Sequence, residues 1–131
     1  MKNIQEITNA TDYIFRLTEF NKGYWSRHFK DEPDYLKILD AYRTVVVSSR
    51  AYKTTMEVAA DASENMCTDL VAVYNEAASK TLVRMTDAAA YLVAKVGTNG
   101  NESKAKIQQA KYMYKDAVAV YNAVSELAEA E

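Results

Sequence analysis

From residue 34 to residue 96 the chain contains neither glycine nor proline, the two residues that most often interrupt regular backbone structure. Elsewhere these residues occur only at Gly23, at Pro33 and within residues 97–101. Apolar residues in the uninterrupted stretches recur at alternating spacings of three and four. That spacing places them on one face of an α-helix, whereas a half-buried strand alternates every second residue. The sequence therefore predicts an all-α fold.

Four segments carry the helical pattern. The first, roughly residues 3–22, is expected to end near Gly23, and Asp31 is the expected N-cap of the second, which runs on after Pro33. The third is expected to end at Gly97 in a left-handed cap, and the fourth to begin after Asn101 as its N-cap. With short connections, these segments predict one domain, residues 1–131, folded as an antiparallel four-helix bundle with long helices.

An alternative joins the second and third segments into one continuous helix, residues 34–96. Such a helix would be roughly 95 Å long at 1.5 Å per residue, with flanking helices and an oligomeric partner to cover it. The hairpin interpretation instead places a turn near residues 60–65, where Asp61 and Glu64 have the spacing of a capping box.

Each segment has a predicted core stripe. The first three stripes comprise Ile4, Ile7, Thr11, Ile14 and Leu17; Tyr35, Ile38, Tyr42, Val45, Ser49, Tyr52, Met56 and Ala59; and Cys67, Val71, Tyr74, Ala78, Leu82, Met85, Ala89, Leu92 and Val96. The fourth comprises Ile107, Ala110, Tyr114, Ala117, Tyr121, Val124 and Ala128, with Met113, Val120 and Leu127 widening it. Buried together, these stripes supply the core of the predicted bundle.

Net charge and the first residues restrict the surroundings of the protein. With 16 basic and 18 acidic residues the chain lacks the basic footprint of a nucleic-acid-binding domain, so such a partner is disfavoured. The first residues lack the apolar core of a secretory signal, and no stretch approaches the ~20 apolar residues of a membrane span. We therefore expect a cytoplasmic protein that does not enter membranes.

Catalytic motifs are absent from the sequence. One cysteine, Cys67, and one histidine, His28, do not make an ordinary metal site, and no phosphate-binding loop or nucleophile elbow occurs. We expect neither an enzyme nor a cofactor. The ten tyrosines suggest core packing, with a pocket for an aromatic or nucleotide ligand as the alternative.

The segment between the first two helices has the composition of a binding hot spot. It holds the only tryptophan and histidine of the chain, and Tyr, Trp and Arg are enriched where proteins bind one another. Its predicted partner-binding residues are Tyr24, Trp25, Arg27, His28, Phe29 and Lys30. The alternative is that Trp25 and Phe29 close the end of the bundle while the cations are solvated.

The second helix carries apolar residues that its core stripe does not include, namely Leu36, Leu39, Val46 and Val47. Either this helix is buried on two sides, or the surplus face meets another molecule. On the second interpretation, the predicted partner-binding residues of this helix are Arg43, Val46, Val47, Arg50 and Lys53.

Charge is also segregated along the chain. Residues 41–56 contain Arg43, Arg50 and Lys53 and no acid, whereas residues 54–79 contain five acids and no base. In an antiparallel dimer the basic part of one subunit would face the acidic part of the other. Ordinary solvated helix surface is the alternative explanation.

These features together predict a non-enzymatic helical protein-interaction module that forms a homodimer or higher homo-oligomer. Regulators, inhibitors and assembly factors, including small phage-encoded ones, often have such profiles. A nucleic-acid binder would instead use Arg27, Lys30, Arg43, Arg50 and Lys53 against phosphates, with Tyr24 or Trp25 stacking on bases.

Overall fold

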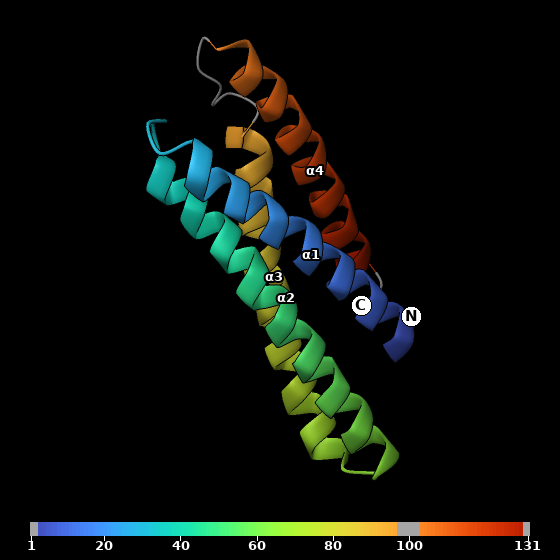
Figure 1. Ribbon diagram of the computed structural model, residues 1–131. Coiled ribbons are helices and arrows are strands. Elements are labelled where there is room, and N and C mark those ends of the chain that lie inside the picture. The colour runs from blue at the N-terminus through green and yellow to red at the C-terminus, as the bar shows by residue number, and fades with distance from the viewer. Residues whose placement is uncertain (1–2, 97–102, 130–131) are drawn as a thin grey trace.

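The computed structural model describes residues 3–96 and 103–129, and these residues form a four-helix bundle (Figure 1). Its helices are α1 (Ile4–His28), α2 (Tyr35–Glu64), α3 (Thr68–Val96) and α4 (Lys104–Glu129). The predicted fold class is confirmed, and the break between α2 and α3 excludes the continuous helix over residues 34–96. The predicted caps Gly97 and Asn101 lie outside the described residues.

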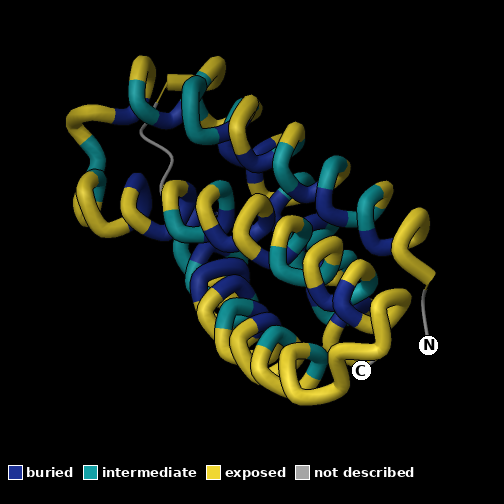
Figure 2. The backbone as a smooth tube through the Cα atoms, turned by 90° about the horizontal axis from the view of Figure 1, so that it is seen from below, coloured by how far each residue is buried: buried dark blue, intermediate teal, exposed yellow. Residues whose placement is uncertain are grey.

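Consecutive helices run antiparallel and pack in a closed ring. The most extensive contact joins α2 and α3; α1 packs on α2, α4 packs on α3, and α1 and α4 pack on each other. Figure 2 shows the buried residues gathered on the sides by which the helices face one another. Each helix therefore buries a stripe against two neighbours, which is the burial that the three-four spacing predicts.

Residues 65–67 form the turn between α2 and α3, slightly later than the predicted turn at residues 60–65. Met66 N–H donates to Ser63 O at 3.1 Å and Cys67 N–H donates to Ala62 O at 2.9 Å, the two bonds of a Schellman motif. The predicted capping box is wrong, because α2 continues through Glu64. The motif requires a left-handed residue, and Met66 supplies it with a φ of 59°.

Met66 is exposed and its backbone is in the left-handed region, which glycine adopts more easily than methionine. We expect Met66→Gly to raise the free energy of unfolding by about 0.5–1 kcal/mol, since the left-handed conformation costs a residue with a Cβ more than it costs glycine. Urea unfolding followed by circular dichroism measures this change. The control Ala72→Gly, at an exposed position inside α3, should lower the same quantity by about 0.5–1 kcal/mol. A comparable loss for Met66→Gly would contradict the interpretation.

The helix ends differ from the sequence predictions at two further places. α1 continues through Gly23 to His28, so the predicted break there is wrong. Packing of Trp25 in the last turn and of Phe29 at the C-cap outweighs the low helix propensity of one glycine. At the start of α2 the N-cap position belongs to Asp34 rather than Asp31; its φ is 61°, and its side chain makes no capping hydrogen bond.

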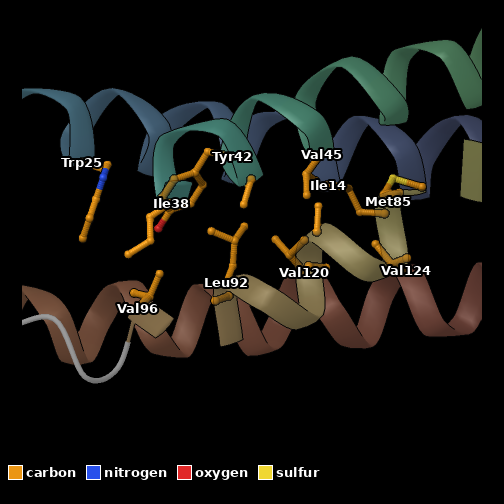
Figure 3. Packing of buried hydrophobic residues seen from close by; sticks show 14 of the residues in the cluster. Ile14, Trp25, Ile38, Tyr42, Val45, Met85, Leu92, Val96, Val120 and Val124 are labelled. Atoms are coloured by element: carbon orange, nitrogen blue, oxygen red, sulfur yellow. The ribbon is translucent and has the colours of Figure 1, made fainter. Parts of the chain in front are cut away.

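An aromatic cluster holds the last turn of α1 against the first turns of α2. Trp25 is fully buried, and its ring stacks on Phe29 with centroids 4.7 Å apart and planes 4° apart. Tyr35 stacks on the same indole at 6.3 Å, and Tyr42 meets it at 6.4 Å. Figure 3 shows Trp25, Ile38 and Tyr42 on one side of the labelled core residues, and Ile14, Val45, Met85, Val120 and Val124 farther along the bundle.

Truncation of Trp25 tests the importance of this cluster. We expect Trp25→Ala to lower the free energy of unfolding by about 3–5 kcal/mol, because it removes a buried indole and leaves a cavity. The control is Phe20→Ala on the same helix, where the ring is 63% exposed and the change should stay within about 0.5 kcal/mol. Equal effects of the two substitutions in urea unfolding would show that the cluster does not anchor α1.

The core stripe of α4 is rotated from the predicted one. Met113, Val120 and Leu127, which were expected only to widen the stripe, are almost fully buried. Ile107 and Tyr114, which were expected inside, are exposed. Periodicity alone does not separate the two sets, because both share the three-four spacing.

Candidate functional site

The aromatic segment at the end of α1 is divided between core and surface. Trp25 and Phe29 are buried and Tyr24 is half-buried, whereas Arg27, His28 and Lys30 are exposed. Trp25 and Phe29 thus lie where the alternative interpretation places them, closing the end of the bundle. Its three exposed cationic or titratable side chains are the ones that a partner could contact directly.

The hydrogen bonds of this segment are also internal. Trp25 Nε1 donates to the carbonyl of Tyr35 at 3.1 Å, and the Tyr35 hydroxyl donates to the carbonyl of Ser26 at 3.1 Å. The indole N–H, which gives tryptophan its directional value at an interface, therefore has its partner within the chain. These bonds join α1 to α2 across the connecting loop.

The predicted surface of α2 mixes buried and exposed positions. Leu39 is buried and Val46 is half-buried, because α2 packs against both α1 and α3 and so buries a wide face. Val47 and Leu36 are 66% and 69% exposed. Arg43 is exposed and lies 3.7 Å from Asp40 on the same helix. Burial on two sides thus accounts for Leu39 and in part for Val46, whereas contact of the exposed residues with another molecule stays a prediction.

The other two cations of the predicted partner-binding surface, Arg50 and Lys53, are engaged by α1. The guanidinium of Arg50 lies over the Phe15 ring, 4.1 Å from its centroid, and Lys53 Nζ donates to Asp12 Oδ1 at 3.1 Å. These four side chains line a hollow of about 290 Å³ between α1 and α2, together with Thr11, Ser49, Thr54 and Glu57. Because Arg50 and Lys53 already have partners, they are less available to an external phosphate or carboxylate than their sequence positions suggest.

A buried polar cluster between α1, α2 and α4 was not predicted from the sequence. Asn21 Nδ2 donates to Asp116 Oδ2 at 2.9 Å and to the Leu17 carbonyl at 2.9 Å. Burial, together with the negative charge of Asp116, raises the pKa of Tyr42 above its usual range, so that its phenol stays protonated. The cluster gives the packed helices a specific register, because a shift between α1 and α4 would separate Asn21 from Asp116.

The Asn21 amide is expected to stabilise the bundle. Asn21→Ala should lower the free energy of unfolding by about 1–3 kcal/mol, since Asp116 then loses a donor in a partly buried place. Thermal and urea unfolding measure the loss. In the control Asn122→Ala, an exposed amide of α4 is removed, and the change should stay within about 0.5 kcal/mol. An Asn21→Ala protein as stable as this control would exclude the role given to the amide.

Other kinds of site have little support in the described part of the chain. It contains no group of three or more His, Cys, Asp or Glu side chains that could hold a metal ion. None of the described helices combines the length and the apolarity needed to cross a membrane. Of the tyrosines, Tyr91 borders a shallow groove between α2 and α3, which is otherwise lined mainly by charged and small residues.

The distal end of the α2–α3 hairpin exposes several apolar side chains, among them Met66, Leu70 and Val73. Figure 1 shows this end projecting past the first turn of α1 and the last turn of α4. The inward stripes of both helices continue onto it. We call this surface the tip face and define it by residues that are all exposed or half-buried: Met56, Ala60, Cys67, Leu70, Val71 and Tyr74.

The change in burial along α3 marks where the covering helices stop. Ala78, Leu82 and Met85 are buried, whereas Cys67, Val71 and Tyr74 on the same stripe are not. The prediction that Cys67 lies in the core is therefore wrong. The two helices are closed against each other at this end by Ala59 and Ala62, which are buried. The larger apolar side chains beside them contact solvent.

Acidic side chains occur along the same stretches of α2 and α3 as the tip face. Glu57, Asp61, Glu64 and Asp69 are exposed, and none of the four forms an ion pair within the described residues. Glu76 is paired with Lys80 at 3.5 Å. An apolar surface rimmed by unpaired charges of one sign is typical of a contact site.

Comparisons of the chain with known protein families, with curated proteins and with solved structures yield no match. The function is therefore inferred from the surfaces described above. Of these, the tip face was missed in the sequence, although the acidic run from residue 54 to residue 79 coincides with it.

Proposed function

We propose that this protein is a non-enzymatic interaction module that binds another protein through the tip face. The observation that carries the proposal is the continuation of the core stripes of α2 and α3 onto an end that α1 and α4 leave open. Along the rest of the hairpin the same stripes are covered by helices. A partner that supplied further apolar side chains would extend the packing that already exists in the chain.

The alternative surface at the end of α1 has less to offer a partner. The Trp25 and Phe29 rings contribute to the core, and the indole N–H donates to a carbonyl within the chain. Arg27, His28 and Lys30 are exposed there and would supply polar contacts without an adjoining apolar anchor from Trp25 or Phe29. Because hot spots combine buried apolar anchors with polar groups, we assign the main contact to the tip face.

A dye on Cys67 reports binding at this end directly, because Cys67 is the only cysteine of the chain and is exposed at the turn. The probes are three synthetic helical peptides that share one apolar stripe and carry basic, uncharged or acidic residues elsewhere. We expect at least one of them to change the dye fluorescence saturably. The control carries the same dye at the start of α4, in a protein with the substitutions Cys67→Ser and Ala105→Cys, and its fluorescence should not respond.

Substitution of two tip-face residues provides the specific test. Leu70→Gln with Tyr74→Gln should weaken peptide binding by about tenfold or more, because it removes apolar contact area from the centre of the surface. Val83→Gln with Ile107→Gln removes two exposed apolar side chains elsewhere and should leave binding unchanged. If none of the three peptides binds wild-type protein, or if both double variants bind equally, the proposed function is wrong.

A further inference from the structure

We infer that the partner at the tip face presents a basic amphipathic helix, that is, an apolar stripe flanked by Lys and Arg. This inference rests on the proposed function and adds the chemistry of the partner. Two independent properties of the hairpin support it: the shape of the surface that α2 and α3 leave open, and the charge around that surface.

The shape of the tip face continues that of the rest of the hairpin. From Ile38 to Tyr52 on α2, and from Ala78 to Val96 on α3, the inward stripes are buried under α1 and α4, which are both helices. Apart from Leu70, which lies beside the stripe of α3, the tip-face residues continue these stripes with spacing of three and four residues. A surface formed by two antiparallel helices accepts a further helix, whose side chains fit between its ridges.

The charge around the tip face is acidic. Residues 54–79 contain five acidic residues and no basic one, and four of these acids have no ion-pair partner within the described part of the chain. Such a rim attracts a basic partner and repels anionic ones. It therefore disfavours nucleic acid, an anionic membrane and acidic proteins as occupants of this surface.

Two of these acids are placed where folding does not favour them. Asp61 and Glu64 lie in the last turn of α2, which contains no basic residue. Carboxylates at the C-terminal end of a helix are opposed by the helix dipole. Asp69, by contrast, lies in the first turn of α3, where the dipole stabilises it. Helix stability thus explains why an acidic residue occurs at position 69, but it does not explain the acidic residues at positions 61 and 64. Binding of a basic partner would explain all three.

A second copy of the chain fits the surface less well. Two tip faces meeting each other would bring the unpaired acids of both copies together. On the basic part of α2, Lys53 is engaged by Asp12 and Arg50 by the Phe15 ring, and Arg43 lies 3.7 Å from Asp40. The charge pattern therefore favours a different protein over self-association through this end.

The three peptides distinguish these occupants. With Cys67 labelled, we expect the basic peptide to bind at least about tenfold more tightly than the acidic one at low ionic strength, and the uncharged peptide to lie between them. Raising the salt concentration to about 0.5 M should reduce the difference, because exposed charges are screened. Equal affinities of the three peptides would overturn the basic partner while leaving the proposed binding function intact.

Neutralising the two unfavourably placed acids separates binding from stability. Asp61→Asn with Glu64→Gln should weaken binding of the basic peptide severalfold without lowering the melting temperature, since the dipole no longer opposes two charges. The control Asp31→Asn with Glu32→Gln changes the net charge equally at the opposite end of α2, and binding should be unchanged. If both double variants bound the basic peptide equally weakly, the loss would reflect the net charge of the protein rather than the acids at the tip face. That result would contradict the inference.

Light scattering after size exclusion tests the remaining occupant. We expect a monomer mass at low and high salt. A dimer that Leu70→Gln with Tyr74→Gln abolishes would assign the tip face to a second copy and overturn the basic partner. A dimer that persists in this variant would form through another surface. The relative affinities of the basic and acidic peptides would then show whether the tip face prefers a basic partner.

Discussion

The antiparallel packing of α2 against α3 is the contact on which the rest of the structure depends. Small buried side chains, among them Ser48 and Ala59 on α2 and Ala78 and Ala88 on α3, let the two helices approach closely over most of their length. α1 and α4 then each pack on one helix of this pair and on each other. The position of the tip face follows from the same contact, because the hairpin is held together beyond the region that α1 and α4 cover.

The helices were predictable because their signals are local. The spacing of apolar residues identified all four, and the scarcity of glycine and proline limited where they could end. The exact ends were less predictable: the left-handed positions belong to Asp34 and Met66, where no glycine marks them. At Gly23 the reverse occurred, since packing of the neighbouring aromatic residues continues the helix through it.

The candidate site was less predictable because burial depends on the lengths and angles of other helices. Val71 and Leu82 lie on one stripe of α3, yet only Leu82 has a neighbouring helix over it. A tryptophan among aromatic and basic residues has the same composition whether it anchors a partner or closes a core, and Trp25 does the second. The Asn21–Asp116 contact joins residues 95 positions apart, which no local pattern could reveal.

The contacts between neighbouring helices form a closed ring, in which α1 and α4 pack together although the chain does not connect them. The first turn of α1 and the last turn of α4 lie near each other in both views (Figures 1 and 2). The first and last helices of the chain are therefore neighbours in space, and the order in which the chain connects the four helices could be changed without changing which helices pack together. A circular permutant that joined these two ends and opened the chain between α2 and α3 would keep all four helix contacts while cutting the hairpin at its turn.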